Sequence, residues 1–225
     1  MFLTRATGMP ISETVAADAG YQAELERFVA ANVPARGKDG ILQSYAAVRR
    51  MRYFSGPDRR PITALRSGRG ACTAKHIILR DVLRRVGERA EVEIVEGDFA
   101  AAIPLHPSQP ADLQAMIRHG GVTDFHCRVR LITTAGDLRL DATWPDDLAA
   151  YGFAVNLTWT GTGDTIPAIA NVTVRSRDED VLGAKVRLLA GLGDETARRR
   201  QDFLRLLSGW LAQIGNVQGK CDGGV

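Results

Sequence analysis

The chain has 225 residues, of which 45% are hydrophobic and 24% are charged, and its formal net charge is +3. This is the profile of a globular protein with one large domain or two small ones, and it excludes a disordered chain or a fibre. The positive charge lies in short arginine clusters within helix-like segments and forms no extended basic run, so we expect no nucleic-acid partner.

The beginning of the chain is expected to be a loose lead-in over residues 1–17. Asp18 then stands where it could cap a helix over residues 21–32, whose apolar residues recur on one face. A second amphipathic pattern over residues 41–51 predicts another helix, which ends before Gly56-Pro57.

A turn containing Gly68 and Gly70 follows and leads into a predicted helix over residues 72–86. Gly87 is the expected stop of this helix. The alternating segment 90–95 predicts a strand directly after it.

Residues 97–124 are punctuated by prolines and are expected to be irregular, with one short helix over 111–118. Two strand-like runs then cover residues 125–133 and 138–142, and Ala135-Gly136 between them indicates a hairpin.

The last part of the chain is expected to hold a strand over 168–174 and two helices near 178–190 and 194–213. Residues 215–225 are rich in glycine and polar residues and are expected to be a flexible tail. Helices first, a small antiparallel sheet next and helices last indicate one α+β domain over residues 1–214.

Three cysteines, Cys72, Cys127 and Cys221, are too few and odd in number for a disulfide framework. The first residues lack a basic start followed by an apolar run, so we expect no signal peptide. No apolar stretch of about 18 residues occurs, so we expect no transmembrane helix and no membrane partner. These features favour a reducing cytoplasm, where a free thiol can act as a nucleophile.

Cys72 stands where the glycine-containing turn meets the start of a predicted helix. The unpaired N–H groups and the dipole at a helix N-terminus favour the thiolate and can bind a developing oxyanion. Cysteine is also among the most buried residue types, so a core cysteine is the alternative interpretation. We expect Cys221 to be free and exposed in the tail.

His126 lies near the start of the first hairpin strand and Asp141 near the end of the second. Antiparallel pairing around a turn near residues 134–136 places residue 126 opposite residues near 143, so the two side chains are expected to be neighbours. A carboxylate beside an imidazole fixes its tautomer and stabilises its protonated form. A surface His–Asp pair is the alternative.

Two segments together resemble the transglutaminase-like superfamily, which has a papain-like Cys-His-Asp fold. The segment Gly70-Ala-Cys72 opens a helix that ends at Gly87, with a strand directly after it. The segment Phe125-His126-Cys-Arg-Val-Arg-Leu is followed by a short turn and then by Asp137-Leu-Arg-Leu-Asp141-Ala-Thr143-Trp144-Pro145. The resemblance covers roughly residues 40–145 and implies that Cys72, His126 and Asp141 are the catalytic residues.

The sequence departs from the family pattern at two places. Cys127-Arg128 follows the histidine where an aromatic residue is common, and Thr73 and Lys75 stand after the cysteine where acidic or aromatic residues are common. These departures leave the substrate open. Residues 146–214 carry no motif that matches the family and form a C-terminal extension to the core.

The resemblance implies a thiol hydrolase or acyltransferase that needs no cofactor and acts on a peptide, an amide or another acyl compound. Hydrolysis of an amide or peptide bond through a thioester is the first expectation, and amide formation with an amine acceptor is the alternative. An inactive binding module of the same fold is the alternative outside enzymes. The oligomeric state stays open.

Three further residues are candidates for substrate binding: Arg69 in the glycine-containing turn, Trp144 after Asp141, and Trp159 in a later loop. Two of them have a plainer interpretation, solvation for Arg69 and packing for Trp144. A metal site is an alternative use of four residues, Cys72, His76, His126 and Cys127. Their spacing matches no zinc-binding pattern, and His126 and Cys127 are neighbours on a strand and should point to opposite faces. We therefore expect no metal, and we expect Cys127 to be a core residue that faces away from His126.

Overall fold

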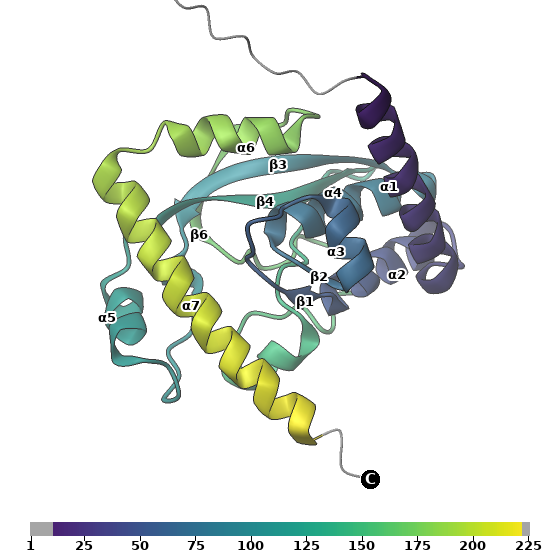
Figure 1. Cartoon of the computed structure of the whole chain (residues 1–225). Helices are drawn as coiled ribbons and strands as arrows, with labels where there is room; N and C mark the ends of the chain where they lie inside the picture. Colours follow the sequence, from purple (N-terminus) through teal and green to yellow (C-terminus); the bar gives the residue numbers. More distant parts are fainter. Residues whose placement is uncertain (1–10, 222–225) are drawn as a thin grey trace, which may run out of the picture.

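The structure is a computed structural model that describes the backbone of residues 11–221 and the side chains of residues 19–214. Helices surround a small antiparallel sheet, so the predicted α+β class is confirmed (Figure 1). Residues 1–10 and 222–225 lie outside the described part, as do the side chains of residues 215–221. The predictions about Cys221 and the extreme ends therefore stay predictions.

The chain begins with three helices, α1 (Ile11–Asn32), α2 (Gly37–Arg50) and α3 (Pro61–Ser67). Because α1 begins at Ile11, Asp18 lies inside the helix and not at its cap, and the expected lead-in is wrong from residue 11 onward. Helix α2 matches the second predicted helix. It turns Tyr45 and Val48 into the core, as its apolar spacing requires.

Helix α4 (Cys72–Arg85) confirms the predicted helix after the glycine-containing turn. The turn holds a short strand, β2 (Arg69–Gly70), which pairs in parallel with β1 (Arg52–Tyr53). A side chain at Gly70 would place its Cβ 2.9 Å from the Cβ of Ala64, so only glycine allows this strand to approach α3 so closely. The turn therefore fixes where α4, and with it Cys72, begins.

The main sheet contains β3 (Arg89–Asp98), β4 (Thr123–Ile132), β5 (Leu138–Leu140) and β6 (Ala170–Ser176) in the order β5-β4-β3-β6. All neighbours are antiparallel, and the predicted hairpin is the pair β4 and β5. Val129 pairs with Leu140, and continuing this register places residue 126 opposite residue 143, as predicted. Strand β5 is short, so Asp141 comes directly after its end.

One face of β3 and β4 is apolar and the other carries paired charges. Ala90, Val92 and Ile94 are buried in the core, whereas Glu91 and Glu93 between them face Arg130 and Arg128 in the register and form ion pairs with them. This alternation is the period of a strand whose two faces have different surroundings.

The segment between β3 and β4 is more ordered than its prolines suggest. It contains a short 3-10 helix, η1 (Ala100–Ala102), and α5 (Ala111–His119), which confirms the predicted helix there. A second 3-10 helix, η2 (Asp146–Tyr151), follows the end of the hairpin.

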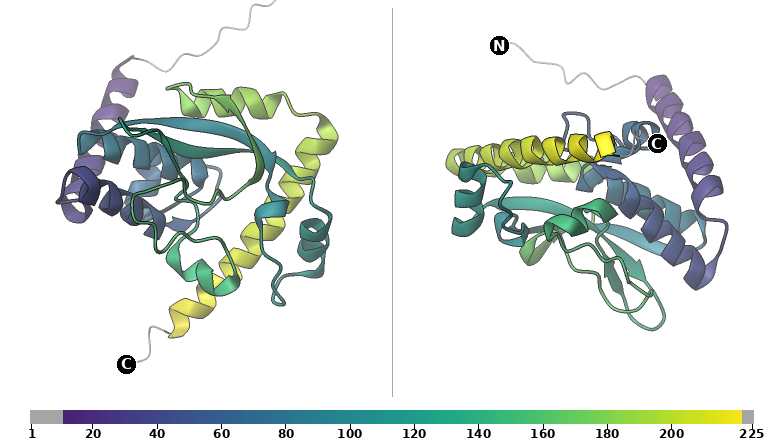
Figure 2. Two further views of the ribbon diagram at one scale, coloured as in Figure 1. Left: turned by 180° about the vertical axis from the view of Figure 1, so that it is seen from behind. Right: turned by 90° about the horizontal axis from the view of Figure 1, so that it is seen from below.

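The C-terminal extension consists of α6 (Val181–Ala190) and α7 (Asp194–Cys221) after β6. Helix α6 runs along β3, and α7 then crosses the molecule diagonally (Figure 1). Seen from below, α6 and α7 lie together along one side of the sheet (Figure 2, right). Helix α7 continues to Cys221, so the chain is helical over most of the segment that was expected to be a flexible tail.

The apolar residues form two clusters. The first lies between α2, α4 and the sheet and includes Ile78, Leu83 and Val129. The second is closed by α7, whose Phe203 and Trp210 pack with residues such as Phe99 and Trp144 that belong to other segments. Within the described residues no helix combines the length and apolar character needed to cross a membrane.

Candidate active site

Cys72 is the first residue of α4, after Ala71 in an extended conformation. The carbonyl of Ala71 accepts the first hydrogen bond of the helix, from the Lys75 N–H. The N–H groups of the residues before Lys75 in the first turn therefore have no acceptor within the helix. Cys72 is 7% exposed. This placement is the predicted one, with the thiol at the positive end of a helix dipole.

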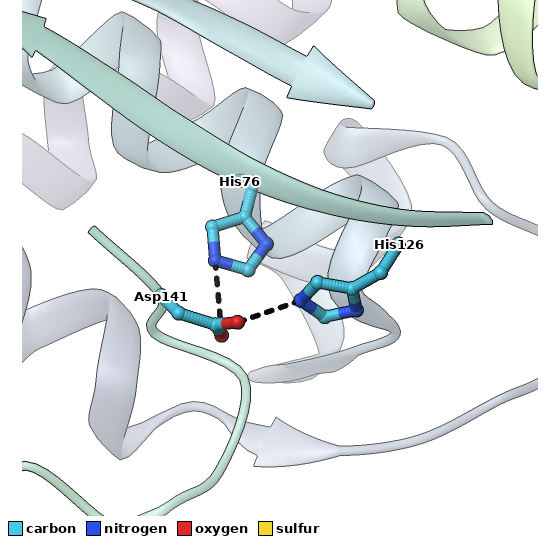
Figure 3. A group of neighbouring side chains, drawn as sticks. All are labelled: His76, His126 and Asp141. Carbon is cyan, nitrogen blue, oxygen red and sulfur yellow. Dashed lines mark hydrogen bonds and ion pairs between the residues drawn. The ribbon is translucent and has the colours of Figure 1, made fainter. Parts of the chain in front are cut away.

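His126 and Asp141, which the sequence predicts to be neighbours, are in direct contact. The Nε2 atom of His126 lies 2.7 Å from Oδ2 of Asp141, and both side chains are almost completely buried (Figure 3). Since Nε2 faces the carboxylate, Nδ1 is the ring nitrogen left for the thiol. The charges of the two groups act on each other: His126 contributes to the lowered pKa of Cys72, and Cys72 contributes to the raised pKa of His126.

The carboxylate of Asp141 is held by the backbone around it. Oδ1 accepts a hydrogen bond from the Thr143 N–H at 3.0 Å, and Oδ2 accepts one from the Ala168 N–H at 2.8 Å. The Asp141 carbonyl accepts from the Tyr45 hydroxyl at 2.9 Å. These hydrogen bonds fix the orientation of the carboxylate so that it contacts His126.

The pKa of Asp141 is lowered and that of His126 is raised, so both groups are charged at neutral pH. Burial alone would raise the pKa of Asp141, but the charge of His126 and its hydrogen bond outweigh burial and hold it well below its usual range. Burial alone would lower the pKa of His126, but the charges of Asp141 and Cys72 raise it to about 10.

Around the Cys72 sulfur lie groups that stabilise its anion. The Lys185 Nζ atom, from α6, is 3.5 Å from Sγ. The pKa of the Cys72 thiol is well below its ordinary value, because a hydrogen bond from the Cys127 thiol and the charges of Lys185 and His126 outweigh the effect of burial. The thiolate is therefore the resting form that these surroundings favour.

Cys127 is a buried core residue, as predicted, but its thiol also takes part in the site. It donates to the Thr73 hydroxyl at 3.7 Å, and its interaction with Cys72 together with burial raises the pKa of Cys127 well above its ordinary value.

A second imidazole, His76, meets the other oxygen of Asp141, at 3.5 Å (Figure 3). Its Nδ1 donates to the Cys72 carbonyl at 2.8 Å, and its Nε2 accepts from the Ala142 N–H at 2.9 Å. These two bonds require the neutral ring with its proton on Nδ1. Burial agrees, since it lowers the pKa of His76 to about 4.

His76, His126 and Asp141 offer ligand atoms that all lie within 4.8 Å of one another, the spacing of a metal site. The hydrogen bonds do not fit that use, because the lone pair of His76 Nε2 already accepts from Ala142 and both Asp141 oxygens accept backbone N–H groups. The donor set is thus arranged as a hydrogen-bonded triad with a supporting histidine.

The three candidates for substrate binding lie in different places. Arg69 is exposed and its guanidinium stacks over the Phe54 ring at 4.3 Å. Trp144 is buried against Tyr53, Phe99 and Phe153, which is the packing role given as its plainer interpretation.

Trp159 is half-buried and packs edge-on against the Tyr45 ring, with centroids 4.9 Å apart. The Tyr45 hydroxyl donates to the Asp141 carbonyl, so Trp159 contacts a residue that positions Asp141 and does not contact Asp141 through this bond itself.

A cavity of about 210 Å³ lies beside the segment that carries Cys72. Arg69 and Tyr53 form part of its wall, whereas Cys72, His126 and Asp141 do not line it. Further walls come from Pro145, directly after the Asp141 segment, and from Leu211 and Ile214 of α7. Charged side chains, Arg52, Arg69 and Asp147, stand among the apolar residues of its wall.

Comparison with protein-family models and with the curated proteins finds no match. Among solved structures, one described as "Crystal structure of a TGase" is similar, with a TM-score of 0.38 and 10% sequence identity. The similarity covers 64% of this chain and 37% of that one, so this chain spans well under half of the length of its structural neighbour.

Sequence reasoning missed two members of the site, Lys185 and the role of His76. Lys185 comes from an extension without a recognisable motif, and its sequence neighbourhood is an ordinary amphipathic helix. The position of His76 in the sequence could have indicated its role, because it lies four residues after Cys72 and so on the same face of α4 as Cys72.

Proposed function

We propose that this protein is a cysteine-dependent acyl-transfer enzyme of the papain-like, transglutaminase-like type, with Cys72 as nucleophile, His126 as base and Asp141 as the group that orients the histidine. The observation that carries the proposal is the 2.7 Å contact between His126 Nε2 and Asp141 Oδ2, together with Cys72 at the start of α4, whose pKa is lowered by surroundings that include the charge of His126. Nucleophile, base and orienting acid in this order are the arrangement that thiol acyl transfer requires.

The reaction starts from the thiolate–imidazolium pair. The Cys72 sulfur attacks the carbonyl carbon of the substrate, and the negative charge moves to the carbonyl oxygen, where the Cys72 N–H at the helix start is the proposed donor. His126 gives its proton to the leaving amine, which departs and leaves a thioester on Cys72. His126 then takes a proton from the acceptor that releases the acyl group.

Water as the acceptor makes the protein an amidase or peptidase, which is our first proposal. An amine as the acceptor makes it an amide-forming acyltransferase. The triad serves both reactions, so it does not by itself select the acceptor.

One observation favours a second candidate, an inactive binding module. The exposed fractions of Cys72, His126 and Asp141 are 7%, 2% and 5%, so the triad is almost closed to solvent. In this case the charged network would stabilise the fold, and a ligand would bind in the neighbouring cavity without reaction.

The experiment that separates the two candidates looks for the covalent intermediate. The wild-type protein is mixed with p-nitrophenyl acetate and with aryl amides and thioesters, quenched in acid, and analysed by peptide mass spectrometry. We expect acyl groups on Cys72 and a burst of leaving group, both absent in Cys72→Ala and strongly reduced in His126→Ala. Cys127 is the internal control, a free buried thiol on the neighbouring strand.

Alkylation by iodoacetamide against pH completes the test. We expect Cys72 to be labelled faster than Cys127 below pH 7, and more slowly in His126→Ala. A protein that forms no acyl-enzyme with any of these donors, and whose Cys72 is labelled only with the profile of an ordinary thiol, would establish the binding module instead.

A further inference from the structure

Lys185 brings a positive charge from the C-terminal extension to the nucleophile. It lies on α6, yet its side chain is only 7% exposed. Its Nζ donates to the Thr73 hydroxyl at 3.1 Å and lies 3.5 Å from the Cys72 sulfur. A sulfur at this distance from a buried ammonium group is within range of a charge-assisted hydrogen bond.

A buried ammonium group requires a partner of opposite charge, because leaving it unpaired would cost several kcal/mol. The groups that face Lys185 come from three elements besides its own: Cys72 on α4, Cys127 and Asp124 on β4, and Arg200 on α7. Asp124 is already paired with the Arg200 guanidinium. The nearest group that can carry the compensating negative charge is the Cys72 sulfur.

The charges around the sulfur agree with this assignment. Burial alone would lower the pKa of Lys185, but the surrounding negative charges, with Cys72 the largest contribution, outweigh burial and raise it. The charge of His126, on β4, also lowers the pKa of Cys72, and the charge of Cys72 contributes to the raised pKa of Tyr53, on β1.

We propose that Lys185 is a fourth catalytic residue, whose ammonium group holds the Cys72 sulfur as a thiolate, so that helix α6 is part of the active site. This inference rests on the proposed acyl-transfer function and deepens it. The thiolate then has two cations, and it does not depend on the His126 proton alone. When the acyl group is released, the sulfur leaves as a thiolate directly beside Lys185, which stabilises this leaving group.

The test measures the thiolate without a reagent that must enter a buried site. Absorbance at 240 nm is followed against pH, and the curve of a matching Cys72→Ala protein is subtracted, so that only the Cys72 thiolate remains. The variants are Lys185→Met, which removes the charge and keeps the length, and Lys185→Gln, which can still donate to Thr73. Arg187→Met is the matched control, since it removes an exposed cation from the same helix.

We expect the midpoint of the Cys72 titration to rise by at least about 1 pH unit in both Lys185 variants, the size of effect that an opposite charge within about 4–6 Å produces. Arg187→Met should leave it unchanged. A midpoint in Lys185→Gln or Lys185→Met equal to that of the wild type would overturn the role of Lys185.

A reciprocal measurement leaves Lys185 in place. In protein with ¹³C-labelled lysine, the Lys185 titration should move to lower pH in Cys72→Ala, because the variant removes the negative partner. An unchanged Lys185 titration would contradict the proposal even if the Lys185 variants failed to fold.

The two proposals fail in different ways. If the wild-type midpoint is low and rises in His126→Ala but not in the Lys185 variants, the acyl-transfer proposal stands and Lys185 is a packing residue. If the wild-type Cys72 titrates near 8.5, the value of an ordinary thiol, and His126→Ala leaves it there, the proposed function falls and the role of Lys185 falls with it.

Discussion

The Nδ1 atom of His76 lies 2.8 Å from the carbonyl oxygen of Cys72, one helical turn earlier in α4. The same ring accepts the Ala142 N–H on its other nitrogen, directly after Asp141. His76 thus joins the backbone of the nucleophile to the backbone of the acid. It is a positioning residue that fixes the distance between two parts of the chain about seventy positions apart.

This role makes the stability of the protein depend on pH through His76. Its pKa is about 4 in the folded chain and about 6.5 when unfolded, so between these values the unfolded chain binds a proton that the folded chain does not. Stability is therefore lost as the pH falls through this window, by about 1.4 kcal/mol per pH unit from this group.

Urea unfolding at several pH values between 4 and 6.5 measures this slope. We expect a shallower slope in His76→Gln, by about one proton, together with a lower stability at pH 7 because the bonds to Cys72 and Ala142 are disturbed. Equal slopes in the two proteins would show that His76 is already charged in the folded state.

Asp141→Asn should lower the pKa of His126, and it also removes one backbone hydrogen bond, because an amide nitrogen cannot accept the N–H of Thr143 or Ala168. The amide keeps a polar atom near Nε2 but removes the charge that raises the pKa of His126 to about 10. We expect this pKa to fall by about 1–3 units, the size of shift that an adjacent carboxylate produces. Imidazole ¹⁵N shifts followed against pH by NMR measure it.

A matched control for this variant is Asp137→Asn, which removes a carboxylate near the turn of the same hairpin where it pairs with Arg130. It should leave the His126 titration as it is in the wild type. A His126 pKa near 6.5 already in the wild type would contradict the charged pair.

The sequence predicts the helices and strands that build the core of the site because their signals are local. The apolar spacing of α4, Gly87 after it and the alternation in β3 and β4 each indicate one element within a few residues of its bounds. The neighbouring positions of His126 and Asp141 follow from the hairpin register alone, which depends only on the position of the turn.

The contributions of distant segments could not be predicted in this way. Lys185 lies 113 positions after Cys72, and which residue of an amphipathic helix enters the site depends on how α6 packs. The helical backbone of residues 11–17 and 215–221 was also not predicted, because the first segment lacks a clear apolar period and the second is rich in glycine and polar residues.

Lys75→Met should destabilise the protein strongly. Lys75 is completely buried, and its Nζ donates to the carbonyl oxygens of Arg49, Met51 and Thr143 at 2.8–3.1 Å. The three bonds use all three N–H donors of an ammonium group, although burial lowers the pKa of Lys75 to about 7. Methionine has similar volume but leaves three buried carbonyls unpaired, so we expect a loss of roughly 2–4 kcal/mol.

The free energy of unfolding in urea measures this loss, and Lys38→Met, which changes an exposed lysine of α2, is the control. The control should differ from the wild type by less than about 0.5 kcal/mol. A Lys75→Met protein as stable as the control would mean that water replaces the ammonium group between the three carbonyls.

Phe203→Ala tests whether the C-terminal extension and the core form the predicted single domain. Phe203 of α7 is completely buried in the second cluster, against Phe99. Removing a buried ring of this size should cost about 3–5 kcal/mol. If residues 1–214 are one cooperative unit, this loss must appear at both clusters, including the first, which Phe203 does not belong to.

Two probes in the same urea titration decide the question. Tryptophan fluorescence includes Trp144 and Trp210 of the second cluster, and alkylation of Cys127 reports opening of the first. We expect one shared midpoint, lowered equally for both probes in Phe203→Ala and unchanged in Arg205→Ala, whose side chain on α7 is 70% exposed. A lowered midpoint for fluorescence alone would mean that α7 and its cluster unfold separately from the helices and sheet that hold Cys72, and that the extension is a second unit.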